Sequence, residues 1–268
     1  GYVFVNHPEA MRQIVTSDRS KYFASSKDNG LLQPLVGDNS LLMIEGDRHK
    51  QRRKLLLPPF HGERMQAYGE LICNLTRQII DQLEPNQAFA ARHVTQEISL
   101  QIILGAVYGL QDSDRSSEFK QRITRLANIF ESPLTSSFLF FPWLQKDLGA
   151  WSPWGNLMRQ QKAIDEAIYQ EIATRRTEDC SQRQDILSLM MSARDESGSA
   201  MKDYELRDEL MTLMLAGHET TATAIAWGLY WLYRYPEIKA KLQAEIASLG
   251  ANPDAMAIAK LTYITDVC

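Results

Sequence analysis

The sequence predicts a mainly α-helical fold with very little β-strand. Apolar residues recur at helical spacing through most of the 268 residues, and only residues 2–5 read as a strand. The longest helical pattern covers residues 203–234, which corresponds to about 48 Å of helix at 1.5 Å per residue. No repeat of fixed period is present in the sequence. We therefore expect one domain that covers residues 1–268 and is built around a long central helix.

Shorter helical patterns precede and follow the long one. Proline marks several of their ends, because a helix begins readily at proline and stops before it. The shorter predicted helices cover residues 8–15, 47–57, 64–83, 95–108, 117–129, 156–176, 186–194, 238–249 and 261–268. Residues 25–43, which are rich in leucine, and residues 130–154, which are rich in aromatic residues, break the helical pattern. We expect both to be connections, and the first to fold over an apolar surface.

The charge balance argues against a general nucleic-acid binder. Lys and Arg total 29 and Asp and Glu total 33, which gives a formal net charge of −4. A general nucleic-acid binder needs a basic excess instead. Hydrophobic residues make up 44% of the chain, a share typical of soluble globular proteins. We therefore expect a small-molecule or protein partner and no nucleic acid.

The cysteines and the two ends of the chain suggest where the protein is found. Cys73, Cys180 and Cys268 are far apart, and no pair of them has metal-binding spacing. This usage favours a reducing compartment, and we expect a cytoplasmic protein. The chain starts at Gly1 and ends inside a helical pattern. We therefore expect a piece of a longer protein, and the sequence leaves an N-terminal anchor open.

Small and polar residues interrupt the middle of the long helix. Its apolar character predicts burial, yet glycine there costs about 1 kcal/mol against alanine and a buried Glu219 needs a partner. Ala216, Gly217, Thr220 and Thr221 fall at i, i+1, i+4 and i+5 and therefore share a face on which a flat or small ligand could lie. The same pattern equally favours close approach of a neighbouring helix, with threonine hydroxyls bonded back to carbonyls.

Two other interpretations of this helix are less consistent with the sequence. A zinc protease needs His-Glu-x-x-His, and here His218 and Glu219 are followed by Ala222 where the second histidine belongs. A single membrane-spanning helix over residues 210–233 would have the required length. Four threonines and the pair His218 and Glu219 would make its insertion expensive. A buried helix is the better interpretation.

A basic helix is predicted upstream, where residues 48–54 hold five Lys or Arg. An ordinary solvated charged face is one interpretation. His49 and Arg53 are four residues apart, so they project together and could hold carboxylates by charge-assisted hydrogen bonds. Arg52 and the other cations are expected to face elsewhere and to help dock an acidic partner.

Taken together, these motifs resemble the cytochrome P-450 family of haem-thiolate monooxygenases. Residues 216–221 resemble the family's oxygen-binding motif, small-Gly-x-acid-Thr-Thr. His49-x-x-x-Arg53, followed by Leu-Leu-Leu-Pro-Pro-Phe over residues 55–60, is similar to the helix that binds haem propionates, although the family more often has Trp in place of His49. Residues 235–237 and 261–267 resemble the stretches that follow the long helix, with Thr262 where proline is usual. The resemblance covers essentially the whole chain.

The resemblance implies a truncated P-450 fold, haem b (iron protoporphyrin IX) as the cofactor and dioxygen as a co-substrate. The implied cofactor-binding residues are His49, Arg53, Ala216, Gly217 and Thr220. Thr220 and Glu219 are the implied catalytic residues, which would supply protons for the cleavage of dioxygen. The family's Glu-x-x-Arg motif and its haem-ligating cysteine would lie beyond Cys268. None of the three cysteines is therefore assigned to iron, and we expect this piece alone to be inactive.

The same resemblance implies partners. No Gly-x-Gly-x-x-Gly nucleotide motif is present, so electrons would come from a ferredoxin or a flavin reductase. The apolar stretches at residues 29–43 and 130–143 imply a hydrophobic small-molecule substrate of the fatty acid or terpenoid class. Two alternatives stay open at this point. They are an all-helical binding or scaffold module without haem, and a membrane protein that spans the bilayer through residues 210–233.

Overall fold

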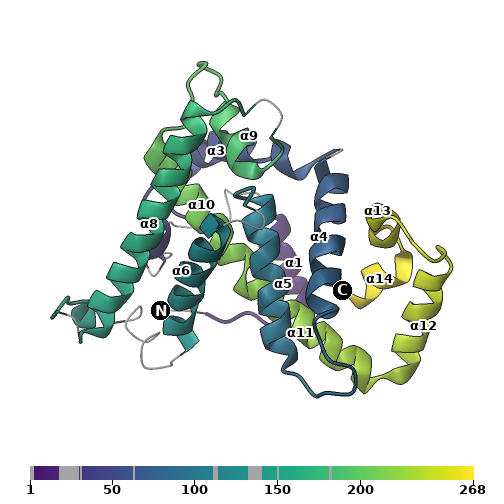
Figure 1. Ribbon diagram of the computed structural model, residues 1–268. Helices are drawn as coiled ribbons and strands as arrows, with labels where there is room; N and C mark the ends of the chain where they lie inside the picture. Colours follow the sequence, from purple (N-terminus) through teal and green to yellow (C-terminus); the bar gives the residue numbers. More distant parts are fainter. Residues whose placement is uncertain are drawn as a thin grey trace.

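Helices dominate the protein in a computed structural model that describes residues 3–17, 30, 32–62, 64–110, 114–131, 141–149, 151–180 and 183–268 (Figure 1). The helices are α1 (Pro8–Thr16), α2 (Gln33–Val36), α3 (Gly46–Leu56), α4 (Arg64–Ile80), α5 (Ala91–Ala106), α6 (Asp114–Glu131), α8 (Pro153–Thr177), α9 (Ile186–Ser192), α10 (Asp203–Gly217), α11 (Glu219–Arg234), α12 (Pro236–Ala247), α13 (Ala255–Ala259) and α14 (Thr262–Val267), with short 3-10 turns η2 (Pro58–Phe60) and η3 (Pro142–Leu144). The mainly α-helical prediction is confirmed.

The described residues form almost no β-structure. A single isolated bridge joins Arg194 and Ala200 in this part of the chain. The strand predicted over residues 2–5 is wrong for residues 3–5, which are extended but unpaired, because a strand needs a hydrogen-bonded neighbour. The predictions for residues 25–29 and 132–140 lie outside the described residues.

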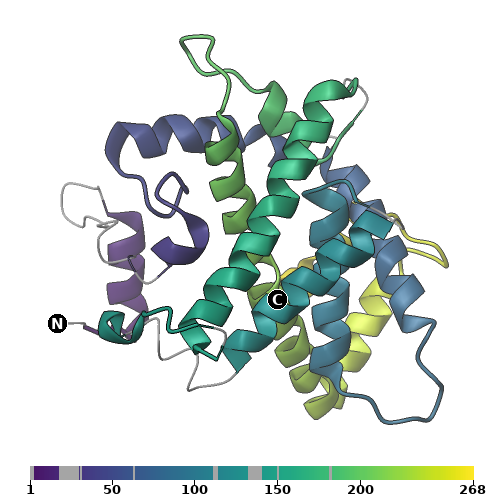
Figure 2. The ribbon, with the colours of Figure 1, turned by 60° about the vertical axis from the view of Figure 1, so that its left-hand side comes forward.

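The core gathers around α10. α8 crosses α10 diagonally, and α5 lies beside α10 and α11 (Figures 1 and 2). Apolar side chains from these helices are fully buried against one another, among them Leu104, Ile164, Ile168, Leu206 and Leu210. α4 and α6 pack outside α5 and α8, respectively. This arrangement fixes α10 at the centre and places its C-terminal end against α5.

The long helix predicted over residues 203–234 is interrupted. α10 ends at Gly217 and α11 begins at Glu219, with His218 between them at φ −76° and ψ −73°. The hydroxyl of Ser99 on α5 donates to the carbonyl oxygens of Gly217 at 3.0 Å and of His218 at 2.9 Å. A side chain that bonds the helical carbonyls in this way is a known cause of local bending. In the described residues no helix is both long and apolar enough to span a bilayer.

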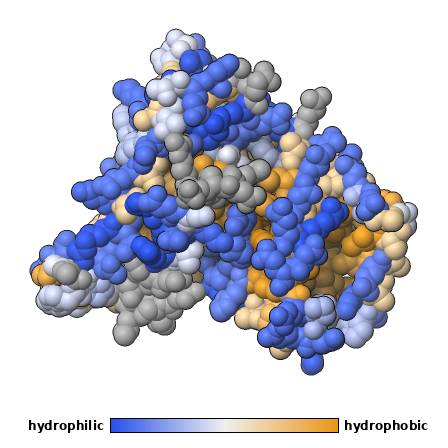
Figure 3. Space-filling view, viewed as in Figure 1, coloured by the Kyte–Doolittle hydropathy of each residue, from blue (hydrophilic) through white to orange (hydrophobic). Residues whose placement is uncertain are grey.

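Burial of the long helix differs between its two halves. Leu206, Leu210 and Met211 on α10 are fully buried, as predicted. On α11 the prediction is wrong, because Trp227 is 56% exposed and Tyr230 is 54% exposed. Figure 3 shows hydrophobic surface on the side of the molecule where α11 to α14 lie. The aromatic side chains of α11 therefore pack mainly on one another, as in the edge-on contact of Trp227 and Tyr230 at 5.6 Å.

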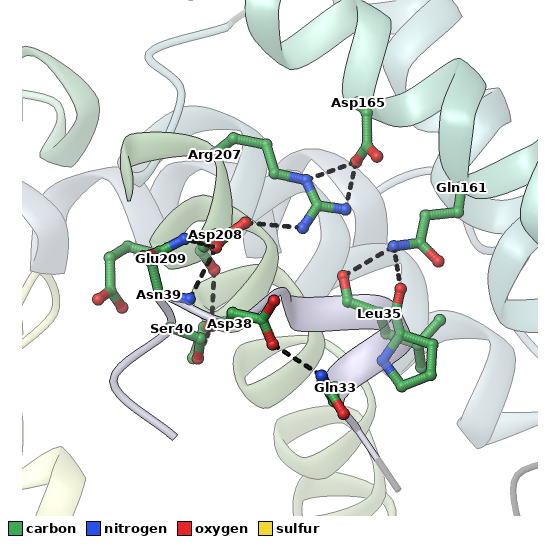
Figure 4. Close-up of polar contacts among 12 residues, drawn as sticks. Gln33, Leu35, Asp38, Asn39, Ser40, Gln161, Asp165, Arg207, Asp208 and Glu209 are labelled. Carbon is green, nitrogen blue, oxygen red and sulfur yellow. Dashed lines mark hydrogen bonds and ion pairs between the residues drawn. The ribbon is translucent and has the colours of Figure 1, made fainter. Parts of the chain in front are cut away.

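Residues 33–41 of the leucine-rich connection are fastened to α10 and α8. Leu35 and Val36 enter the core, which confirms that this connection folds over an apolar surface. Asp208 accepts hydrogen bonds from the Asn39 backbone and side chain at 2.9 and 3.0 Å, and the Gln161 amide donates to the Leu35 carbonyl at 3.0 Å (Figure 4). We call residues 33–41 the clamped segment.

Arg52 is buried beneath this region, which corrects the prediction that it docks a partner. Its guanidinium donates to Glu205 and, at 3.5 Å, to Glu209 on α10. Glu209 also accepts the Leu41 backbone N–H at 3.2 Å. A buried guanidinium needs carboxylate partners, so α10 draws this cation inward. Burial raises the pKa of Glu209 to about 7, although Leu41 and Arg52 lower it and Asp208 raises it.

The raised pKa of Glu209 predicts that this carboxyl group contributes a loss of stability as the pH rises from about 4.5 to 7. In that interval the unfolded chain releases a proton that the folded chain retains, so the free energy of unfolding falls. The Glu209→Gln variant carries no titrating group at this position, so its free energy of unfolding should lack this fall with rising pH. The exposed Glu196, whose pKa is lowered by Lys54, provides the control Glu196→Gln, which should keep the wild-type slope. Urea unfolding across this pH range tests the prediction, and equal slopes for all three proteins would contradict it.

Candidate functional site

The junction of α10 and α11 exposes a low face on the side away from α5. Ala216 and Thr220 are exposed there, and Thr221 and Ala224 continue the same face along α11. The Thr220 hydroxyl donates to the Ala216 carbonyl oxygen, as the close-packing interpretation of the sequence expected. Small side chains leave the backbone within reach of a flat ligand, so this face keeps the geometry that the ligand-binding interpretation requires.

Gly217 serves the packing of α5. A Cβ atom built on this glycine would lie 2.6 Å from Cδ1 of Ile103, a distance that forces the isoleucine to move. The absence of a side chain at Gly217 therefore lets α5 approach the junction closely. The close-packing interpretation thus applies to Gly217, which faces a neighbouring helix, whereas Ala216 and Thr220 face outward.

Glu219 is held by α5. Its carboxylate accepts hydrogen bonds from Arg92 Nη2 at 3.0 Å and from Gln96 Nε2 at 2.8 Å. Arg92 also donates to the Thr223 hydroxyl at 3.4 Å. Two donors fix the carboxylate against α5 while 37% of its side chain stays exposed. A carboxylate that is anchored and still in contact with solvent suits the transfer of protons between water and a site.

The predicted anion-binding pair lies on α3. Arg53 is exposed, and its side chain has no ion-pair partner among the described residues; His49 is partly buried. α3 contacts α10 through Arg52 at Glu209, and from there to Gly217 is about 12 Å along the helix at 1.5 Å per residue. The contact of Arg52 with Glu209 thus fixes α3 against α10 at this distance from Gly217.

A cavity of about 690 Å³ lies nearby but belongs to a different surface. It is bounded by α3, η2, the start of α4 and the connection between α9 and α10. Its described lining includes Lys54, Arg64 and Glu196 and none of the predicted site residues. The predicted site is therefore a face between helices and lies outside this cavity.

The residues present fit a haem group. Haem offers two carboxylates and a flat apolar ring, and Arg53 offers an exposed guanidinium that forms no ion pair with the described part of the chain and can hold a carboxylate. The exposed face at Ala216 and Thr220 is free of bulky side chains. No cluster of three or more His, Cys, Asp or Glu in the described residues could hold a metal ion directly.

Sequence analysis missed the residues of α5 that organise the junction. Arg92, Gln96 and Ser99 occur at i, i+4 and i+7 and form one polar stripe that contacts Glu219 and the carbonyls of the junction. The stripe does not stand out in the sequence, because the polar residues His93, Thr95 and Glu97 lie between its members. The helix that this stripe contacts, α11, is more than 100 residues away, and nothing in the sequence pattern of α5 indicates this contact.

Solved structures identify the class to which this helical architecture belongs. The heme domain of cytochrome P450DA matches with a TM-score of 0.74 at 22% identity, over 88% of this chain and 52% of that chain. The cyanobacterial CYP120A1, solved with retinoic acid bound, matches with a TM-score of 0.72 at 20% identity, over 88% of this chain and 51% of that chain. The fold is therefore that of a cytochrome P450 domain.

Sequence comparisons give the family. A family model described as Cytochrome P450 matches residues 1–268. Cytochrome P450 135B1 of Mycobacterium bovis is 35% identical over 253 residues, which are 94% of this chain and 52% of that protein. Cytochrome P450 137 of Mycobacterium tuberculosis is 35% identical over 217 residues, 81% of this chain and 45% of that protein. The chain belongs to the cytochrome P450 family and spans about half the length of these relatives.

Proposed function

We propose that the full-length protein is a haem monooxygenase that hydroxylates a hydrophobic small molecule. Family membership supports haem and dioxygen as its cofactor and co-substrate. The observation that carries the proposal is the junction of α10 and α11, where an exposed Thr220 lies beside a Glu219 that two α5 side chains hold. A hydroxyl next to an anchored carboxylate is suited to deliver protons to one face of a bound group.

Each residue of the proposed site has a separate task. When it is bound through a cysteine thiolate from outside this chain, haem supplies the reduction and cleavage of dioxygen. Thr220, whose hydroxyl donates to the Ala216 carbonyl oxygen in this structure, would turn its hydroxyl to donate above the exposed face, and Glu219 would supply the proton that Thr220 passes on. Ala216 keeps the exposed face free of side-chain bulk, and Gly217 lets α5 approach the junction closely. His49 and Arg53 hold the acidic side chains of haem from α3.

The proposal includes partners and a substrate class. Electrons come from a ferredoxin or a flavin reductase, and the substrate is a fatty acid or a terpenoid. The apolar residues of the clamped segment, such as Leu35, support a hydrophobic substrate only in part, because they are buried in the core. Since the axial cysteine is expected beyond Cys268, the 268-residue piece alone is proposed to be inactive.

Replacement of Thr220 by alanine tests the proposal. In the full-length enzyme the variant should keep haem and show the red-shifted carbon monoxide band of a thiolate ligand. It should divert reduced oxygen to hydrogen peroxide, because proton delivery is lost while electrons still arrive. The neighbouring exposed Thr221→Ala variant is the matched control. An unchanged yield of product per electron in Thr220→Ala would contradict the proton-delivery role, and a full-length protein without the thiolate-type band would contradict the proposed function.

Replacement of Arg53 by alanine should weaken haem retention. A charged hydrogen bond contributes about 1.5–3 kcal/mol, so the dissociation constant should rise roughly 10- to 100-fold. Haem transfer to apomyoglobin measures the loss. Lys54→Ala removes the adjacent exposed cation, which pairs with Glu196 at 2.8 Å, and should leave haem retention unchanged. Equal retention in the two variants would contradict the assignment of Arg53.

A further inference from the structure

His218 lies at the junction of α10 and α11 with its side chain turned into the protein. Only 8% of that side chain is exposed. Its backbone carbonyl accepts hydrogen bonds from Ser99 Oγ at 2.9 Å and from the Ala222 amide at 3.0 Å. The backbone on both sides of the ring is therefore anchored, which limits where the imidazole can go.

One nitrogen of the imidazole is an orphan. Nδ1 is buried and has no hydrogen-bond partner among the residues that the structure describes. A buried polar atom without a partner costs about 1–3 kcal/mol, and such atoms in native proteins usually have a functional explanation or bind water. A neutral imidazole has one N–H and one acceptor nitrogen, so water can satisfy Nδ1 of His218 in either tautomer.

The other nitrogen faces the carboxylate of Glu219. Nε2 lies 3.8 Å from Glu219 Oε1, the oxygen that accepts the Gln96 amide at 2.8 Å. This separation is longer than a hydrogen bond, and hydrogen bonds at active sites are often long before ligands are bound. The imidazole thus has the carboxylate proposed to deliver protons on its Nε2 side and the unpartnered Nδ1 on its other side.

We propose that His218 is a positioning residue that acts through Glu219 and returns to it the proton that each cycle consumes. The inference rests on the proposed function, in which Glu219 gives up that proton towards Thr220. In the return step Nε2–H gives its proton to Glu219 Oε1, and Nδ1 takes a proton from a water molecule. The hydroxide that remains takes a proton from bulk solvent. The net change is one proton moved from solvent to the carboxylate. Tautomer exchange with solvent resets the ring.

The charges around the ring are consistent with this role. Burial lowers the pKa of His218, Glu219 opposes that shift, Arg92 adds to it and Glu97 opposes it. The net lowering keeps the ring neutral around neutral pH, and a neutral ring can both give and accept a proton. Glu97 is itself paired with Lys120 on α6. Glu219 directly follows His218 in the sequence and its carboxylate lies 3.8 Å from Nε2, so it is the carboxylate that the proposal couples to the ring.

A titration tests the coupling without haem. Histidine-labelled chain is followed by NMR, and the His218 signal is assigned by its loss in His218→Gln. Glu219→Gln removes the carboxylate that raises the pKa of the ring, so the midpoint of the His218 titration should fall. An unchanged His218 midpoint in Glu219→Gln would overturn the inference.

Kinetics of the haem-loaded full-length protein test the relay. His218→Gln keeps hydrogen-bonding groups but cannot pass a proton, so the share of electrons lost as hydrogen peroxide should rise severalfold with a larger solvent deuterium isotope effect. In a Glu219→Gln background the same change should add nothing, because both residues act in one path. His93→Gln is the control and should behave as the wild type.

The outcomes separate the two proposals. Unchanged product per electron in haem-loaded His218→Gln, or equal losses in both backgrounds, would overturn the relay. A full-length protein that binds no haem would overturn the proposed function instead, and the titration of His218 would still decide whether the imidazole and Glu219 are coupled.

Discussion

Replacing Arg175 by alanine is expected to lower the free energy of unfolding by about 3–5 kcal/mol. The Arg175 side chain is fully buried at the end of α8 and donates to Glu171 at 2.8 Å, and to Asp185 and Ser188 at 2.6 Å each. It also donates to the Tyr108 carbonyl. Its removal leaves two buried carboxylates without their cation, which costs more than the loss of the pair itself.

The neighbouring residue supplies the control for this prediction. Arg176 pairs with Asp203 on the surface, where their side chains are 43% and 49% exposed. Because exposed pairs contribute about 0–1 kcal/mol, Arg176→Ala should change stability little. Urea unfolding of both variants, monitored by circular dichroism at neutral pH, measures the difference. Similar losses for the two alanine variants would show that Arg175 does not neutralise the buried carboxylates.

Replacing Gly37 by alanine is expected to cost about 3 kcal/mol or more, because it disturbs the clamped segment. Gly37 has a φ of +82°, and a Cβ atom there would lie 2.2 Å from Asp208 Oδ1. With a ψ of 166°, Gly37 lies in a backbone region that is essentially restricted to glycine, where another residue costs about 1–3 kcal/mol. Movement of Asp208 would also break its hydrogen bonds with Asn39 and Arg207, and a buried carboxylate that loses donors adds to the cost.

Gly62→Ala separates these two causes. Gly62 also has a positive φ, +71°, but no described atom lies within 4 Å of the Cβ position. It should therefore lose only the backbone contribution of about 1–2 kcal/mol. Thermal and urea unfolding of both variants give the comparison. If Gly37→Ala were no less stable than Gly62→Ala, the contact with Asp208 would not contribute to the stability of the clamped segment.

The sequence predicts the helices well and their ends less well. Periodic apolar residues and prolines place α3, α8 and α12 to within a few residues. The interruption at His218 was not predicted, because it depends on the hydroxyl of Ser99, which precedes it by 119 residues. Periodicity reports which side of a helix is apolar, whereas a bend depends on what another helix donates to its carbonyls.

In the candidate site, too, local spacing predicts some features, whereas contacts between distant helices determine the others. Residues four apart on one helix share a face, so the prediction that His49 and Arg53 project together needs only local spacing. The exposed position of Thr220 was not predicted, because the apolar pattern around it indicated burial. The donors that hold Glu219 come from α5 and could be found only after folding. Arg52 shows the converse error, since a run of cations gives no sign that one of them will be drawn beneath the surface by Glu205 and Glu209.

The clamped segment joins three parts of the protein into one mechanical unit. Gln161 ties it to α8, Asp208 ties it to α10, and Arg207 ties those two helices to each other through Asp165 at 2.8 Å. Protein interiors are nearly incompressible, so a push on any member of such a triangle is transmitted to the other two. A molecule that bound to residues 33–41 and displaced them would therefore also displace α10, and the displacement would reach the bend at His218 at its C-terminal end.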